Sequence, residues 1–328
     1  MRKFLIIAFI TFLNLNYSQS PLETSDYDEQ KKWVDSVYNS LNQEEKIGQL
    51  FTVWVATKYG EEEISHISSL INKYKLGGLI FSLGKIEDQA DATNHFQSIS
   101  KVPLLIGMDA EWGIGMRLDD AFSFPYNMTL GAIEDESLVY KVGERIGKHA
   151  NRLGVHINFA PVVDINTNPD NPIIGSRSFG EDKFNVTEKA LAYLKGMQST
   201  NLMGSAKHFP GHGDTQTDSH YTLPLISFDK ERIYDVELYP YKKLIENNLS
   251  SVMTAHINVP SLQKGNLPST LSNNIINNIL KNELSFNGLI VTDGLDMKGV
   301  VDFTKKEYAD VSAMKEGNDI LLMPNDLE

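Results

Sequence analysis

Eight short apolar runs spaced along the whole chain constrain the fold more than any other feature of the sequence. Each run is bounded by Gly, Pro or Asp, as is typical of buried strands. The runs are 48–55, 78–82, 103–108, 156–160, 204–207, 251–255, 288–292 and 319–323. Helical patterns lie between them, notably over 137–153, 184–200, 230–247, 273–282 and 305–317. A strand followed by a helix, repeated eight times, predicts an α/β fold, either a closed parallel barrel or a doubly wound open sheet.

Polar residues at the ends of these runs favour the barrel. Side chains that can carry chemistry lie at or just beyond the C-terminal ends of predicted strands: Asp109, Asp164, Lys207, His208, His256 and Asp293. A barrel collects its active-site groups at this end, whereas an open sheet would use fewer strands. The chain also lacks the glycine-rich turns of nucleotide-binding folds. We therefore predict a (β/α)8 TIM-like barrel.

The N-terminus carries the pattern of a secretory signal peptide. Arg2 and Lys3 precede an apolar run over 4–13, which is shorter than the roughly 20 residues of a spanning helix. We expect a signal peptide over 1–20, a polar linker over 21–30 and one catalytic barrel over 31–328. The chain has no cysteine, so no disulfide, thiolate metal site or lipid-anchored cysteine is expected. An exported protein without a membrane anchor, periplasmic or extracellular, is predicted.

No helical pattern follows the eighth run to cover the last strand. A barrel backs each strand with a helix, so the expected barrel is truncated at its C-terminal end or continues into a further domain. The oligomeric state is left open.

The charge distribution argues against nucleic acid and anionic lipid as partners. The formal net charge is −13, and lysines and arginines form only short pairs. Binding to a phosphate backbone requires a basic patch. No nucleic-acid partner is expected.

Residues 207–220 concentrate three of the eight histidines and two carboxylates in the sequence KHFPGHGDTQTDSH. Pro210 and the glycines around it exclude a helix, and proton-transfer groups gathered on a loop predict a site. His208 and His212 are four residues apart, as in zinc-binding helices, but that helix is excluded here. We therefore expect no metal.

Two smaller patterns supply candidate reactants. Asp293 directly follows an apolar strand and could attack an electrophilic carbon or stabilise positive charge there, although it could instead cap the next helix. Asp296 is expected to be a cap or a supporting residue. Asp218 is placed to orient His220, which makes a proton carrier, although a surface turn with a solvated histidine has the same pattern.

Five segments together resemble glycoside hydrolase family 3, and within it the β-N-acetylhexosaminidases. They are 154–164 (GVHINFAPVVD), 175–180 (GSRSFG), the 207–220 loop, 253–256 (MTAH) and 291–297 (VTDGLDM). The resemblance implies a retaining mechanism with Asp293 as nucleophile and His220, paired with Asp218, as acid and base. It also implies no cofactor, and a set of residues that hold the sugar's hydroxyl and acetamido groups: Asp109, Arg117, Arg177, Lys207 and His208.

The segment 110–116 (AEWGIGM) departs from the family, which more usually has Gln-Glu-Gly-Gly there. Trp112 is expected either to pack under the loop or to offer an apolar face to a sugar or a lactyl-peptide group.

The resemblance predicts removal of non-reducing-end β-linked N-acetylglucosamine from peptidoglycan fragments or chitooligosaccharides, so the expected partner is a carbohydrate. Two alternatives stay open. One is a family 3 β-glucosidase or β-xylosidase, which usually takes its acid from a later domain. The other is a catalytically silent sugar-binding protein.

Overall fold

The computed structural model describes residues 20–304, 306–325 and 327. Within them, eight parallel strands form one sheet in the order β7-β6-β5-β4-β3-β2-β1-β8. The strands are β1 Phe51–Val55, β2 Gly78–Phe81, β3 Leu105–Met108, β4 Ile157–Asn158, β5 Met203–Phe209, β6 Ser251–Thr254, β7 Leu289–Thr292 and β8 Leu321–Leu322. A parallel bridge between Val291 and Ile320 joins β7 to β8. The sheet is therefore a nearly closed (β/α)8 TIM-like barrel.

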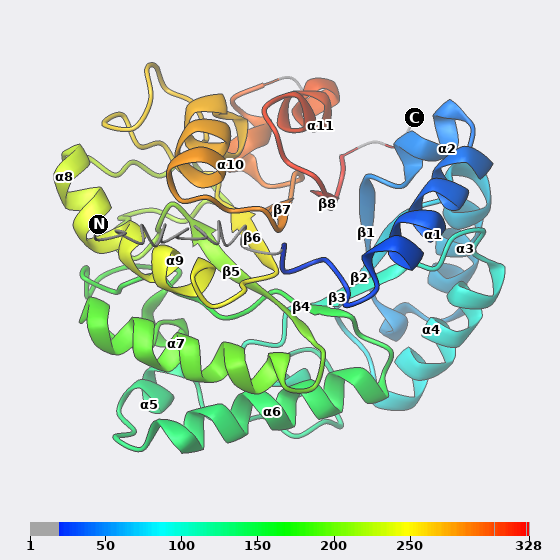
Figure 1. Ribbon diagram of the computed structural model, residues 1–328, viewed down its shortest axis with the longest axis horizontal. Helices are drawn as coiled ribbons and strands as arrows, with labels where there is room; N and C mark the ends of the chain where they lie inside the picture. Colours follow the sequence, from blue (N-terminus) through cyan, green and yellow to red (C-terminus); the bar gives the residue numbers. More distant parts are fainter. Residues whose placement is uncertain (1–19, 305, 326, 328) are drawn as a thin grey trace, which may run out of the picture.

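Helices connect successive strands and surround the barrel (Figure 1). They are α1 Tyr27–Ser40, α2 Gln43–Gly48, α3 Glu61–Tyr74, α4 Ile86–Ile99, α5 Asn127–Gly131, α6 Glu136–Arg152, α7 Lys183–Gln198, α8 Lys230–Arg232, α9 Leu238–Ile245, α10 Lys298–Val301 and α11 Lys306–Lys315. Two π-helical segments, η4 Ile233–Glu237 and η6 Asn274–Glu283, complete the connections before β6 and β7. Short 3-10 turns cover Thr57–Tyr59, Ile114–Met116, Gly175–Arg177 and Ser269–Leu271.

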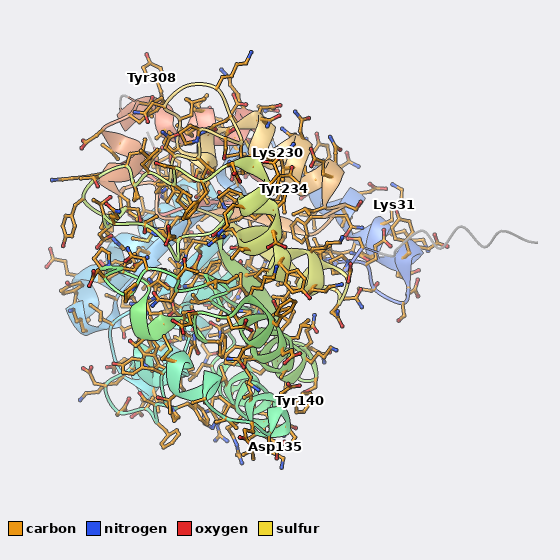
Figure 2. All side chains as sticks on the ribbon, turned by 90° about the vertical axis from the view of Figure 1, so that its left-hand side faces the viewer. Lys31, Asp135, Tyr140, Lys230, Tyr234 and Tyr308 are labelled. Atoms are coloured by element: carbon orange, nitrogen blue, oxygen red, sulfur yellow. The ribbon has the colours of Figure 1, made fainter. Side chains whose placement is uncertain are left out.

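Helices α6 and α7 show how the sequence sets the outer layer. Asp135 caps α6 by accepting from Ser137 N at 2.9 Å, which satisfies a free amide of the first turn. Gly143 and Gly196 let the two helices touch, since a Cβ on Gly143 would lie 2.2 Å from Tyr193 O. Figure 2 shows Asp135 and Tyr140, at the start of α6, at the opposite end of the molecule from Tyr308 on α11.

The inside of the barrel is a separate apolar cluster from strand residues. It contains Ile80, Ile157, Phe159, Met253, Val291 and Leu322, and Trp54 packs against it. Inward-facing residues of alternate strands form such layers in parallel barrels. The larger cluster between strands and helices holds most of the remaining core.

The structure corrects several predicted boundaries. Helix α1 begins at Tyr27, capped by Asp26, so the last four residues of the predicted linker over 21–30 are helical. Strand β5 extends to Phe209, so Lys207 and His208 lie within it. The predicted helix over 230–247 is interrupted by η4. All but the last residue of the predicted signal peptide lies outside the described residues, and no described helix is long and apolar enough to span a bilayer.

Candidate active site

A cavity of about 540 Å³ opens at the carboxyl ends of the strands. Its volume lies in the range of small-ligand pockets, roughly 300–1,000 Å³. Seven of the eight predicted site residues line it: Asp109, Arg117, Arg177, Lys207, His208, His220 and Asp293. Asp218, the eighth, contacts the cavity through His220. Trp112 lines the cavity as well and also packs edge-on against Tyr126, with ring centroids 4.6 Å apart.

Three cations and two carboxylates form a network on the β3 to β5 side of the cavity. Lys207 Nζ lies 2.7 Å from Asp109 and 2.8 Å from Glu111. Arg177 donates to both oxygens of Glu111, from Nε at 3.0 Å and from Nη2 at 2.7 Å. Arg117 donates to the second oxygen of Asp109 at 2.8 Å. Each carboxylate is therefore fixed by two cations.

Because these groups are removed from water, each charge in the network strongly shifts the pKa of its neighbours. Burial alone would raise the pKa of Glu111, but Arg177 and Lys207 outweigh it and hold the pKa well below its usual range. Burial would also raise the pKa of Asp109, but Lys207 and Arg117 outweigh burial and lower this pKa. Burial would lower the pKa of Lys207, but the two carboxylates raise it. All these groups stay charged at neutral pH, so the cavity presents fixed donors and acceptors.

Asp164 sets the position and tautomer of His208. Its carboxylate accepts from His208 Nδ1 at 2.7 Å and from the backbone amide of His212 at 2.6 Å. Arg177 Nη2 lies 3.2 Å from His208 Nε2, and a guanidinium only donates. Asp164 therefore holds a proton on His208 Nδ1.

Asp293 is a partly buried carboxylate directly after the end of β7. Its backbone amide donates to Thr254 O at 2.9 Å, and its Oδ1 accepts from the Gly294 amide at 2.8 Å. Burial would raise the pKa of this carboxyl, but His208, His256 and the amide lower it below its usual value. The carboxylate is therefore ionised at neutral pH and faces the cavity.

The capping role considered for Asp293 and Asp296 is wrong. Helix α10 begins at Lys298, its N-cap position is Met297, and no side chain caps it. Asp296 instead lines the cavity, and burial together with the Asp293 charge raises its pKa.

Asp218 and His220 form a pair at the cavity edge. Asp218 Oδ1 lies 2.6 Å from His220 Nδ1 and accepts from the His220 amide at 2.8 Å. The His220 side chain is 54% exposed and lines the same cavity as Asp293. A proton on Nδ1 is held by the carboxylate, which leaves Nε2 available for proton exchange.

The other histidines near the site are structural. His212 is buried between the hydroxyls of Thr215, at 2.6 Å, and Ser219, at 3.2 Å. Burial and His208 lower its pKa to about 4, so it is neutral and holds the loop. His256 is buried, and its Nε2 donates to Gly294 O at 2.8 Å. No group of three or more His, Cys, Asp or Glu side chains in the part of the chain that the structure describes could hold a metal ion.

Sequence reasoning missed Glu111 and Trp54 as cavity residues. Glu111 lies two positions after Asp109, so in extended chain both side chains point the same way. That spacing was a usable signal. Trp54 lies at the end of β1 and lines the cavity.

The barrel, with charged and titratable side chains around a cavity at the carboxyl ends of its strands, has the arrangement of an enzyme of the (β/α)8 class. The chain belongs to glycosyl hydrolase family 3: the profile of the Glycosyl hydrolase family 3 N terminal domain matches residues 42–328.

Among similar proteins, "Beta-hexosaminidase A" of Pseudoalteromonas piscicida is 35% identical over 97% of this chain and 56% of its own length. "Beta-N-acetylglucosaminidase/beta-glucosidase" of Cellulomonas fimi is 30% identical over 90% of this chain and 53% of its own length. The solved structure of a glycoside hydrolase family 3 beta-N-acetylglucosaminidase from Paenibacillus sp. str. FPU-7 superposes with a TM-score of 0.81 at 36% identity, covering 86% of this chain and 55% of that one. The chain thus spans about half the length of these relatives.

Proposed function

We propose that this chain is the catalytic barrel of a retaining β-N-acetylhexosaminidase. It would remove non-reducing-end β-linked N-acetylglucosamine from peptidoglycan fragments or chitooligosaccharides. One observation carries the proposal: the Asp293 carboxyl group and the His220 ring, which is paired with Asp218, line one cavity. The names of the Pseudoalteromonas and Paenibacillus relatives support the same activity.

In the first step an Asp293 oxygen forms a bond to the anomeric carbon as the glycosidic bond breaks. His220 Nε2 gives its proton to the departing oxygen, and the imidazolium becomes neutral imidazole. In the second step His220 takes a proton from water, the water oxygen bonds to the anomeric carbon, and Asp293 is released as a carboxylate. Asp218 holds the ring and stabilises its charged form.

The network on the β3 to β5 side suits the non-reducing end of the sugar. Asp109 accepts from sugar hydroxyls, while Lys207 and Arg177 donate to hydroxyl and acetamido oxygens. A buried network already fixed by ion pairs loses little freedom when the sugar binds.

Two other functions share parts of this site. The combined name of the Cellulomonas relative supports β-glucosidase as a second activity of the same site. A silent sugar-binding protein needs neither an ionised carboxylate nor a proton carrier, so the presence of both favours an enzyme. We also propose export to the periplasm or beyond, on the signal-peptide pattern of residues 1–20.

The test is covalent trapping. The chain is incubated with a 5-fluoro N-acetylglucosaminyl fluoride, digested, and the labelled peptide is mapped by mass spectrometry. Label on Asp293, abolished by Asp293→Asn and retained in the matched surface variant Asp302→Asn, is the expected result. Turnover of nitrophenyl N-acetylglucosaminide without such a label would contradict a covalent aspartate. Preference for nitrophenyl glucoside would favour the glucosidase.

A further inference from the structure

The cavity has two chemically different sides. One is the charged network of Asp109 and Lys207 near β3 and β5. The other is formed near β8 and β1 by Trp54, by Met323 just after β8, and by Asp296 in the β7 to β8 connection. The second side has no role in the mechanism above.

The side formed by Trp54, Met323 and Asp296 leads out of the cavity. A neighbouring hollow shares Trp54, Asp296 and Met323 with the cavity and continues to Val53 and Pro324. The site is therefore extended past these three residues toward the surface between β1 and β8. A ligand longer than one sugar has room in this direction.

The topology places the leaving group on this side. The charged network holds the sugar's hydroxyls near β3 to β5, and Asp293 meets the anomeric carbon at the end of β7. Strands β8 and β1 come next around the barrel. Asp296 lies within electrostatic range of both Asp293 and His220, the group that must reach the glycosidic oxygen. Whatever is bonded to the anomeric carbon thus extends toward Asp296.

Asp296 has a carboxyl group available for a ligand. It is in none of the ion pairs found among the described residues, unlike Asp109, Asp164 and Asp218. Gly294 leaves space for it, since a Cβ there would lie 2.9 Å from Asp296 Oδ1. An exposed carboxyl group at the cavity edge, without an ion pair among the described residues, is well placed to accept a hydrogen bond from a hydroxyl or an amide N–H.

Trp54 offers a surface for the ring that bears those groups. Its indole is partly buried and is held by Tyr59, with ring centroids 6.1 Å apart and planes inclined at 50°. Aromatic faces pack against the C–H face of a pyranose, and Met323, which lines the same cavity and hollow, adds a polarisable thioether.

We propose that Trp54 and Asp296 form a subsite for a leaving-group pyranose. The sugar ring packs on the indole, and one of its hydroxyl or acetamido N–H groups donates to the Asp296 carboxylate. This inference rests on the proposed glycosidase function and adds the residues that select a sugar as leaving group.

The test compares two substrates with the same glycone. N,N′-diacetylchitobiose, called chitobiose below, has a sugar as leaving group, whereas N-acetylglucosaminyl fluoride has a single atom that cannot occupy the subsite. In Trp54→Ala and Asp296→Asn, the ratio of kcat/KM for chitobiose to kcat/KM for the fluoride should fall at least about tenfold. Asp302→Asn, an exposed Asp-to-Asn change in the same connection, should leave the ratio within about twofold of the wild type.

Equal losses on both substrates would overturn the subsite, since they would mean that the residues act on the glycone or on the fold. An unchanged ratio would overturn it as well. If Trp54→Ala does not fold, Trp54→Phe and Asp296→Asn carry the test. If the wild type hydrolyses the fluoride but the variants keep the wild-type ratio, the subsite alone is refuted. If the wild type is inert toward both substrates, the proposed function is refuted.

Discussion

Removing the charge of Glu111 tests whether the buried network holds the site together. Glu111→Gln keeps the shape of the side chain but leaves Lys207 and Arg177 with one anion fewer. The Glu111 side chain is 0% exposed and lies 2.7 Å from Arg177. At an effective dielectric constant of about 20, one such pair attracts by roughly 6 kcal/mol. Desolvation offsets part of this attraction, and loss of one partner of a buried pair typically costs about 3–5 kcal/mol.

The pH dependence of this loss has a definite sign. The pKa of Glu111 is lowered from 4.5 in the folded protein, so its contribution is present above that pH and is lost as the pH falls through the folded value. The difference in unfolding free energy between wild type and Glu111→Gln should therefore be largest near neutral pH and shrink below about pH 4.5.

Urea unfolding followed by circular dichroism measures the effect, and kcat/KM should fall as Lys207 and Arg177 lose their fixed positions. Glu144→Gln is the matched control, because its pair with Lys148 is 35% and 55% exposed. That change should alter stability by less than about 1 kcal/mol. A Glu111→Gln protein with the wild-type midpoint and KM would refute the coupling of the network.

Three further changes probe the loop and its support. His220→Ala should lower turnover about 10²-fold for poor leaving groups and far less for an activated nitrophenyl leaving group, and equal losses would count against His220 as the acid. Gly213→Ala would place a Cβ 1.9 Å from Ile165 O, so the loop must shift. We expect a loss of about 1–3 kcal/mol in urea unfolding together with lower kcat, and wild-type values for both would be inconsistent with this packing. Burial raises the pKa of Glu237 to about 7, so its stabilising contribution is present below its ordinary value of 4.5 and is lost as the pH rises through 7. The wild type should lose about 3 kcal/mol of unfolding free energy between pH 5 and 8, whereas Glu237→Gln should not lose it. Equal losses in both proteins would disprove the raised pKa of Glu237.

The order of strands and the end of the barrel that bears the cavity were predictable. Apolar runs bounded by turn residues marked the strands, and parallel strands bring their carboxyl ends together. Asp109, Lys207 and Asp293 come from three separate strands, and the structure places all of them on one cavity.

The interactions behind those residues were not predictable, because they depend on partners distant in sequence. Glu111 is fixed by Arg177, 66 residues away. His212 has the same type of side chain as His220, and only the folded loop shows that hydroxyl groups enclose the first while the second is exposed. Residue type and spacing identify groups able to transfer protons, but the folded structure decides which of them are open to the cavity.

One of the two shortest strands, β8, closes the barrel and also forms part of the cavity wall. Strand β8 pairs with β1 only through Phe51–Leu321 and Thr52–Leu322, and it meets β7 at the single bridge beside it. Leu322 and Met323 border the cavity. Thermal opening of this seam would remove part of the wall of the cavity, so ligand occupancy and seam closure are thermodynamically linked. Hydrogen exchange at the amides of 320–323 should consequently slow when the cavity is filled.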